Sequence, residues 1–336
     1  MSGSTKSIQQ IAQLAGVSAS TVSRVINHNG RFSKETEERV LRVIRENNYV
    51  PNMTAKGLRT NRTRIVGIIV PDITNPHFAN LVLHMEKTLF QSGYSCMICN
   101  TNESEEIEKQ HIRSLIAQNV RGIAMISGVQ NDPALSEIPV IYLDRRSHNI
   151  SNRTDDVMIE SDNEQGGYLA TKELLRCGCK RIVILKCLKN DDNQIARYNG
   201  YRRALAEYGI AEDSGLWADA TAVSIPDARN AVAGLLSSGE RFDGIMSTTD
   251  TMAVGALIAL REYGLRVPED VMITGFDDSP LADACGPGLT SVHQDTEEMA
   301  RLASCILLQM MEEEKKPRKA YYKLPVHLTI RRSTMK

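Results

Sequence analysis

The sequence predicts an N-terminal all-α head joined to an α/β body whose parallel strands form two doubly wound sheets. Closely spaced helical patterns, separated by a tight turn, occupy residues 7–48. From residue 64 onward short apolar runs alternate with helical patterns, which is typical of parallel sheets with crossover helices. These units are too numerous for one compact sheet, so we expect two lobes. A chain of 336 residues with 42% hydrophobic composition is long enough to build several cores.

The first helix of the head has clear start and stop signals. Ser7 followed three residues later by Gln10 forms a capping box. Gly16 interrupts the helical pattern where a tight turn is needed. The apolar face between these signals consists of Ile8, Ile11, Ala12 and Ala15.

A second helix follows the turn, with Ser18 as its N-cap and Val22, Val25 and Ile26 facing inward. A third helix from Ser33 through Asn48 closes the small core. The second helix keeps short side chains and one arginine outside, and these suit base edges and phosphates in a DNA major groove: Ala19, Ser20, Thr21, Ser23 and Arg24. The pattern predicts a helix-turn-helix; an ordinary helical hairpin is the alternative from this segment alone.

Charge is distributed unevenly along the chain, although the formal net charge is only −1. Residues 1–64 contain eleven Lys and Arg against four acidic residues, a balance of +7, which leaves −8 for the remainder. A basic module joined to an acidic body is typical of a phosphate-binding head on a separate sensor. The asymmetry therefore favours nucleic acid as the partner of the head.

Several classes of protein are disfavoured by composition. No apolar stretch has membrane-spanning length and the polar N-terminus is not a signal peptide, so we expect a cytoplasmic protein without a membrane partner. The seven cysteines are irregularly spaced. Cys96 and Cys99 lie three apart in a strand-like run and so face opposite sides. Cys177 and Cys179 have no second metal-like pair nearby, and we predict neither a metal site nor a cofactor.

The body is predicted to contain at least eight strands and six helices. The strand-like runs are Ile65–Val70, Tyr94–Cys99, Gly122–Ile126, Val140–Leu143, Val157–Ile159, Arg181–Leu185, Gly244–Met246 and Val271–Thr274. The helix candidates are Phe78–Ser92, Glu105–Gln118, Gln165–Arg176, Ala196–Tyr208, Ile225–Ser237 and Thr251–Tyr263.

Polar side chains follow several of these strands. Ligands of doubly wound sheets bind beyond the carboxyl ends of the strands. At these positions the chain carries Asp72, Ser127, Asp144, Arg145, Asp277 and Asp278. Carboxylates and an arginine in a cleft suit sugar hydroxyls, and Phe78 could stack on a ring face.

A short segment links the head to the body. Asn52–Arg59 is about two helical turns, too short for a helix that is stable alone in water; a flexible linker is the alternative. The head, this linker and Ile65–Phe78 resemble the lactose-repressor and purine-repressor family of bacterial transcription regulators. The resemblance continues in the family's order through Asp144–Arg145, Asp162–Gly167, Arg197–Tyr201, Gly264–Val271, Gly275–Asp278 and Leu289–Asp295.

The resemblance implies three domains. Residues 1–50 would form the helix-turn-helix domain, 51–62 the hinge helix or linker, and 63–336 the effector-binding and dimerisation core. The core would have the fold of periplasmic sugar-binding proteins, with lobe one at about 63–160 and 293–323 and lobe two at about 162–291 and 325–336. The chain would cross between the lobes near Ser161, Val292 and Leu324.

The resemblance also implies the DNA contacts. In this family the linker forms a hinge helix only on operator DNA, and a leucine from each subunit enters the minor groove. Leu58 matches that residue, with Lys56 and Arg59 beside it, whereas Gly57 departs from the polar residue usual there. The complete set of expected DNA-binding residues is Ser18, Ala19, Ser20, Thr21, Ser23, Arg24, Asn27, Lys56, Leu58 and Arg59.

An effector pocket between the lobes is the third implication. Its expected residues are Asp72, His77, Phe78, Ser127, Asp144 and Arg145 from the first lobe, and Arg197, Thr249, Asp250, Asp277 and Gln294 from the second. Two alternatives stay open: Asp250 could instead cap the helix that starts at Thr251, and His77 could lie at the rim. Gly128–Ile138 is shorter than in most relatives and should lack a full helix, and Lys186–Asp192 replaces a small Gly-rich loop.

These features together predict a ligand-responsive transcriptional regulator. We expect a homodimer on a palindromic operator, with a carbohydrate as the small-molecule effector; whether the effector releases or tightens DNA binding stays open. An enzyme is the alternative class, but no nucleophile elbow, phosphate-binding Gly loop or metal cluster is present. A solute-binding transport protein would share the body but would need export. The apolar residues Leu81, Met85 and Leu89 could serve a dimer interface or the core.

Overall fold

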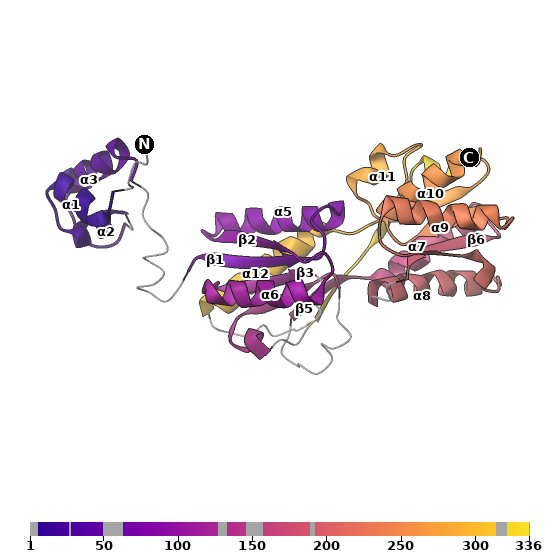
Figure 1. The fold of residues 1–336 in the computed structure, drawn as a ribbon, viewed down its shortest axis with the longest axis horizontal. Coiled ribbons are helices and arrows are strands. Elements are labelled where there is room, and N and C mark those ends of the chain that lie inside the picture. The colour runs from indigo at the N-terminus through magenta and orange to yellow at the C-terminus, as the bar shows by residue number, and fades with distance from the viewer. Residues whose placement is uncertain are drawn as a thin grey trace. The chain divides into compact units, whose positions relative to one another are not determined.

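The structure is a computed structural model that describes residues 6–26, 28–49, 63–126, 133–145, 157–188, 192–313 and 321–335. The chain forms two separate units, Met1–Thr63 and Arg64–Lys336. The second unit contains two sheets with helices on both faces (Figure 1). Among the described residues, no helix is long and apolar enough to cross a membrane.

The head contains three helices: α1 (Ile8–Ala15), α2 (Ala19–Ile26) and α3 (Lys34–Glu46). The predicted capping box is confirmed, because Ser7 Oγ accepts from Gln10 N and Gln10 Oε1 accepts from Ser7 N. Gly16 ends α1 with φ 64°, in the left-handed region that favours glycine. The third helix ends at Glu46 rather than Asn48. The core of the head is Ile11, Ala12, Ala15, Val22, Val25, Val40 and Tyr49.

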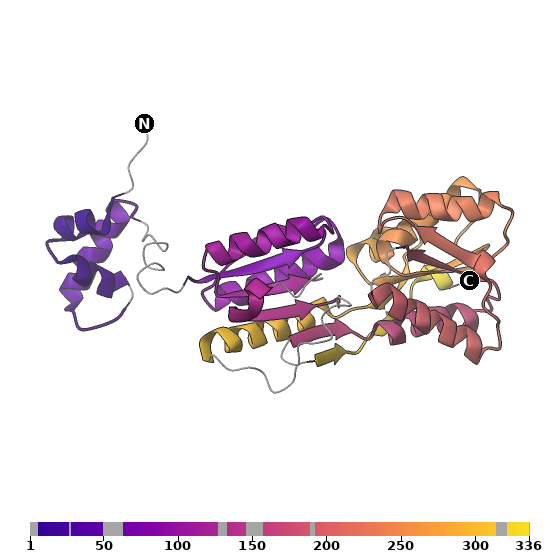
Figure 2. The same cartoon turned by 60° about the horizontal axis from the view of Figure 1, so that its bottom comes forward.

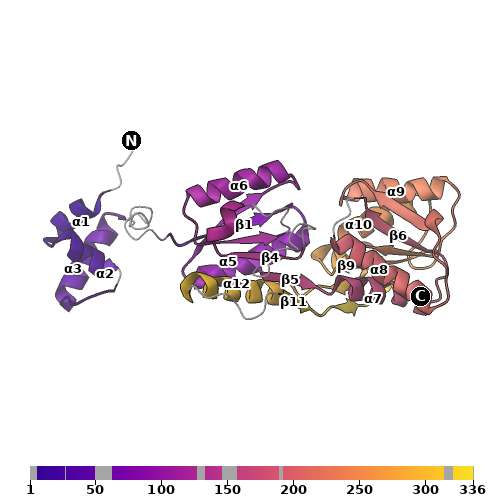
Figure 3. The same ribbon diagram turned by 90° about the horizontal axis from the view of Figure 1, so that it is seen from below.

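The first sheet of the body is wholly parallel and has the order β11-β5-β4-β3-β1-β2. Its strands are β1 (Ile65–Val70), β2 (Ser95–Asn100), β3 (Gly122–Ile126), β4 (Val140–Leu143), β5 (Val157–Ser161) and β11 (Tyr321–Leu324). The helices α5 (Pro76–Gln91) and α12 (Thr296–Glu313) pack on one face, and α6 (Glu105–Ala117) packs on the other (Figure 3). A five-residue 3-10 helix, η1 (Pro133–Glu137), is the only helical segment described between β3 and β4.

The second sheet has the order β12-β10-β9-β8-β6-β7, with only β12 antiparallel to its neighbour. Its strands are β6 (Ile182–Cys187), β7 (Trp217–Ala220), β8 (Gly244–Ser247), β9 (Met272–Asp277), β10 (Thr290–His293) and β12 (His327–Thr329). The helices α7 (Asn163–Arg176) and α8 (Asp192–Glu207) cover one face. The other face is covered by α9 (Ile225–Ser237), α10 (Asp250–Glu262) and α11 (Pro280–Ala284).

The chain passes between the two sheets three times. It leaves the first sheet after β5, returns to it after β10, and leaves it again between β11 and β12. As a result α12, drawn in gold in Figure 2, packs in the first lobe although it follows the second lobe in the sequence. These three passages put the carboxyl ends of the first sheet's strands and those of the second sheet's strands on opposite walls of one pocket.

The elements that the sequence pattern did not predict are mostly short or at sheet edges. β7, β11 and β12 have three or four residues, and several of their side chains are half-buried or exposed, so no continuous apolar run marks them. Trp217, which is partly buried, begins β7 and makes an edge contact with Tyr198. Cys96 and Cys99 pack on opposite faces of the first sheet, as predicted.

Candidate functional site

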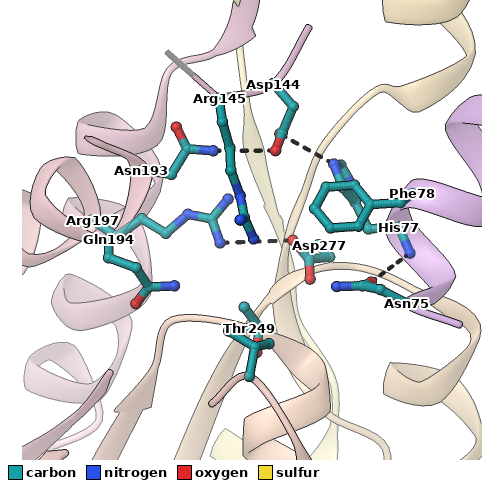
Figure 4. Close-up of a pocket in the computed structure, with 11 residues that line it drawn as sticks. Asn75, His77, Phe78, Asp144, Arg145, Asn193, Gln194, Arg197, Thr249 and Asp277 are labelled. Atoms are coloured by element: carbon teal, nitrogen blue, oxygen red, sulfur yellow. Dashed lines mark hydrogen bonds and ion pairs between the residues drawn. The ribbon is translucent and has the colours of Figure 1, made fainter. Parts of the chain in front are cut away.

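Polar side chains from both lobes converge on one pocket (Figure 4). Asp144 directly follows β4, Asp277 is the last residue of β9, and Thr249 precedes α10. The cavity measures about 20 Å³, which is room for about one water molecule. The lining residues are Asn75, His77, Phe78, Asp144, Arg145, Asn193, Gln194, Arg197, Val223, Thr249 and Asp277.

The two pocket carboxylates lie on backbone that L-residues rarely adopt. The φ angle is 65° at Asp144 and 112° at Asp277. Such conformations cost on the order of 1–3 kcal/mol each and cluster at ligand-binding positions. The strained geometry therefore indicates that the placement of these two carboxylates serves a site.

His77 and Asp144 form a buried pair in the first lobe, with His77 Nε2 3.2 Å from Asp144 Oδ1. Burial disfavours the charged form of each group, but the attraction between the imidazolium of His77 and the carboxylate of Asp144 outweighs that cost. The pKa of His77 is therefore raised, with Asp144 and Asp277 contributing. The pKa of Asp144 is lowered to about 2 by His77, Arg197 and Arg145 against its burial. Both pKa shifts favour the ionised form of the pair.

An amide pair joins Asp144 to the second lobe. Asn193 Nδ2 donates to Asp144 Oδ2 at 3.3 Å, and Asn163 Nδ2 donates to Asn193 Oδ1 at 3.1 Å. Asn163 Oδ1 in turn accepts from Arg197 Nε at 2.8 Å. These side chains are 4% exposed or less, so their hydrogen bonds replace the water that burial removes.

Asp277 lies between the guanidinium of Arg197 and the amide of Gln294. Arg197 Nη1 is 3.8 Å from Asp277 Oδ1, and Gln294 Nε2 donates to the same oxygen at 2.8 Å. Arg197 also lies over the ring of Phe276, with its Cζ 3.7 Å from the centroid. Burial raises the pKa of Asp277, although His77 and Arg197 oppose the rise. Gln294 Oε1 is buried without a hydrogen-bond partner.

The aromatic wall of the pocket is formed by Phe78. The guanidinium of Arg145 lies over its ring, 5.2 Å from the centroid, and Arg145 Nη1 is 3.3 Å from Glu103 Oε1. An apolar ring beside convergent polar groups is the usual composition of a small-molecule pocket.

Three predicted residues that the structure describes, Asp72, Asp250 and Gln294, are not among those lining the pocket. Asp72 Oδ1 accepts from the backbone N and the hydroxyl of Thr74, so its carboxylate closes a local turn. Asp250 accepts from Ser291 Oγ at 2.6 Å and from Ser279 N at 2.7 Å. The capping alternative for Asp250 is wrong, because α10 begins at Asp250 itself and Thr249 is its N-cap.

The other predicted pocket residues are distributed as follows. His77, Phe78, Asp144, Arg145, Arg197, Thr249 and Asp277 line the pocket. Gln294 contacts the pocket residues Asp277 and His77, and Ser127 lies outside the described residues.

Four lining residues were missed in the sequence: Asn75, Asn193, Gln194 and Val223. Asn75 had a local signal, since an Asn before Pro76 is a typical N-cap, and its Oδ1 accepts from His77 N at 3.0 Å. Asn193 and Gln194 come from the first turn of α8, which begins four residues earlier than its sequence pattern predicts.

In the head, α2 presents a polar surface. Ser18 Oγ accepts from Thr21 N at 3.1 Å and so caps the helix. Ser20 and Arg24 are exposed, Thr21 and Ser23 are half-buried, and Ala19 packs partly against the head core. Asn27, Lys56, Leu58 and Arg59 lie outside the described residues.

Comparison with known proteins agrees with this architecture. Residues 7–52 match the model of bacterial regulatory proteins of the lacI family, and residues 171–334 match that of the periplasmic binding protein-like domain. A helix-turn-helix head on a two-lobed binding body defines a class of DNA-binding regulators. The chain belongs to the lacI family of bacterial regulatory proteins.

Full-length relatives support this assignment. The transcriptional repressor PurR of Haemophilus influenzae (strain PittEE) is 34% identical over 97% of this chain and 98% of its own length. The ribose operon repressor of Halalkalibacterium halodurans is 33% identical over 97% and 96%, respectively. These relatives are transcriptional regulators.

Two solved structures share the fold. A complex of the transcriptional regulator CelR with cellobiose is 30% identical, with a TM-score of 0.74, over 98% of this chain and 99% of that chain. The lac repressor dimer bound to operator and the anti-inducer ONPF is 25% identical, with a TM-score of 0.87, over 99% and 100%. The predicted fold class and family are thereby confirmed.

Proposed function

We propose that this regulator is a repressor whose body binds a sugar or sugar derivative in the pocket between its lobes. The observation that carries the proposal is the composition of the pocket: two carboxylates, two guanidinium groups and three side-chain amides surround the ring of Phe78. Ionised carboxylates only accept hydrogen bonds, so they call for a ligand rich in donors. Sugar hydroxyls supply such donors, and a sugar ring has an apolar face for Phe78.

The relatives support the same ligand class. CelR was solved in complex with cellobiose, and the Halalkalibacterium halodurans relative is named for a ribose operon. A purine offers fewer donors to Asp144 and Asp277 than a sugar does. Purines are therefore the competing class that a ligand screen should include.

Binding would have to change the contacts between the lobes. The cavity of about 20 Å³ has no room for a sugar, and its polar groups bind one another. An effector would replace the Asp144–Asn193 hydrogen bond and the Arg197–Asp277 ion pair with its own hydroxyls. Because the Asp144–Asn193 hydrogen bond joins the two lobes, occupancy would shift lobe closure and thereby operator affinity, a coupling that is reciprocal.

The DNA-binding form is proposed to be a homodimer on a palindromic operator. Each α2 would enter a major groove, and paired Leu58 side chains would enter the minor groove between them. The lac repressor, which shares the fold, was solved as a dimer bound to its operator. We place the protein in the cytoplasm, where its DNA is.

The first lobe offers a face for the second subunit. Leu81, Met85 and Leu89, considered for an interface in the sequence, are fully buried in the core of their own chain. Instead α5 exposes Leu83 (60%) and Phe90 (67%), seven residues apart and so on one side of the helix. The neighbouring edge strand β2 exposes Ile98 (50%). Large apolar side chains gathered this way typically mark a protein interface.

A thermal-shift screen of the full chain tests the ligand class. The panel contains sugars, sugar phosphates, nucleosides and purines. A ligand at a hundred times its Kd should add about 2.7 kcal/mol to stability. Arg197→Ala should abolish the shift, whereas Arg203→Ala, on the exposed side of α8, should leave it intact. A stability increase with purines alone would overturn the sugar proposal. Operator affinity measured with and without the stabilising ligand then shows whether that ligand releases or tightens DNA binding.

A further inference from the structure

Two histidines face each other where the chain passes between the lobes. His293 is the last residue of β10 and His327 is the first residue of β12. They are paired across the antiparallel ladder, with ring centroids 4.6 Å apart and ring planes at 36°. Both side chains reach solvent, and the His293 side chain is 36% exposed.

This spacing fits two imidazoles that bind one metal ion. With metal–nitrogen bonds of about 2.1 Å and an angle of about 90–110° at the metal, the ring centroids would lie about 4.5–5.3 Å apart. The observed 4.6 Å falls within that interval. The strands therefore already hold the rings at a chelating distance.

A carboxylate supports one of the two rings. Asp278 Oδ2 is 3.0 Å from His293 Nδ1, which leaves Nε2 of that ring for a metal. Histidines that ligate metals almost always have such a carboxylate or carbonyl partner at the other nitrogen. Asp278 is itself held by Arg331 Nη1 at 2.7 Å and Thr329 Oγ1 at 2.8 Å.

We propose that His293 and His327 form a binding site for one divalent transition-metal ion of the class that prefers imidazole, such as Zn²⁺. The described part of the chain contains no cluster of three or more His, Cys, Asp or Glu suited to a metal. The site thus supplies two protein ligands and leaves the other positions to water. An open site of this kind binds reversibly and does not serve as a structural metal centre.

The position of the site gives it a regulatory consequence. The residue after His293 is Gln294, which donates to Asp277 in the proposed effector pocket and lies 3.5 Å from His77. A metal ion would tie two of the three passages between the lobes together and restrict their relative movement. This consequence rests on the proposed function, whereas metal binding itself does not.

Calorimetric titration of the full chain with ZnCl₂ tests the site, in a Cys305→Ser background because Cys305 is an exposed thiol. We expect one ion per chain. His293→Ala and His327→Ala should each weaken binding at least tenfold, and His327→Cys should retain it because a thiolate also ligates zinc. His28→Ala, which removes an exposed histidine of the head, is the matched control and should bind like the parent.

Two outcomes would overturn the proposal: an unchanged affinity in the His293→Ala/His327→Ala double variant, or no binding to the parent at 1:1 stoichiometry. Circular dichroism in EDTA should show that the double variant melts like the parent, which excludes unfolding as the cause of a loss. The titration uses neither operator nor effector. A failed sugar screen would therefore leave its result intact.

Discussion

Gly167 lies directly against the backbone of Arg197: a Cβ atom on the glycine would be 2.1 Å from the Arg197 carbonyl oxygen. Farther along the same pair of helices, a Cβ atom on Gly200 would be 2.1 Å from the Glu164 carbonyl oxygen. The two glycines thus allow the backbones of α7 and α8 to touch. This contact fixes the point from which the Arg197 side chain enters the pocket. There Arg197 Nε donates a hydrogen bond to Asn163 Oδ1, from α7.

Replacing Gly167 with alanine should destabilise the body. The new methyl group meets backbone rather than a movable side chain, so the two helices must separate, at a cost of about 1–3 kcal/mol or more. The measurement is the free energy of unfolding from urea denaturation. Gly234→Ala is the matched control, because nothing lies within 4 Å of its Cβ position in α9, and it should stabilise by about 0.5–1 kcal/mol. Equal effects of both substitutions would contradict the close packing.

Asp250 should make stability depend on pH. Burial, reinforced by the charge of Asp277, raises its pKa to about 8, although Ser291 and Ser279 donate hydrogen bonds to it. Between about pH 4 and pH 8 the folded protein therefore holds a proton that the unfolded chain releases. The stability from this group is complete below pH 4 and is lost as pH rises through 8, with a slope of at most about 1.4 kcal/mol per pH unit.

Asp250→Asn tests this linkage. The asparagine keeps an acceptor for Ser279 N, and the Ser291 hydroxyl can reverse to accept from the amide. His77 titrates in both proteins, so the difference between variant and parent reports Asp250 together with its effect on the neighbouring Asp277. Denaturation from pH 5 to 9 should show the parent losing stability relative to the variant as pH rises. Parallel curves would show that Asp250 is ionised throughout.

The sequence predicted local features of the fold better than long-range ones. The capping box at Ser7 and Gln10 and the buried strand Ile65–Val70 are set by neighbouring residues, and both are observed. Asn163 and Asn193 are 30 residues apart, and their pairing depends on how α7 and α8 pack, which no local pattern shows. Asp72 follows a strand, which is why it was predicted to line the pocket. Its carboxylate instead accepts a hydrogen bond from the hydroxyl of Thr74, two residues along the chain, and Asp72 does not line the pocket.

Phe90→Glu should weaken the proposed homodimer. A charge on the exposed side of α5 would be buried without a partner in the interface, which is costly. We expect the dimer dissociation constant, measured by sedimentation equilibrium, to rise at least tenfold, with Leu83→Glu acting in the same direction. Leu188→Glu is the control, since Leu188 is 53% exposed but follows β6 in the second lobe. If neither α5 variant changes the dimer dissociation constant, the interface does not include this side of α5.

Leu58→Ala should weaken operator binding at least tenfold, about 1.4 kcal/mol. Leu58 is outside the described residues, so this prediction comes from its place in the linker sequence. An apolar side chain in the minor groove costs unstacking energy and gains a bent duplex that contacts more protein. Alanine is too short for that wedge, while the α2 contacts in the major groove remain, so affinity should fall without vanishing. Fluorescence anisotropy with labelled operator measures the loss, and Leu188→Ala is the control.

Effector affinity measured without DNA should stay the same, because the hinge would act on the body only when operator is bound. An unchanged operator affinity would refute the assignment of Leu58 to the minor groove.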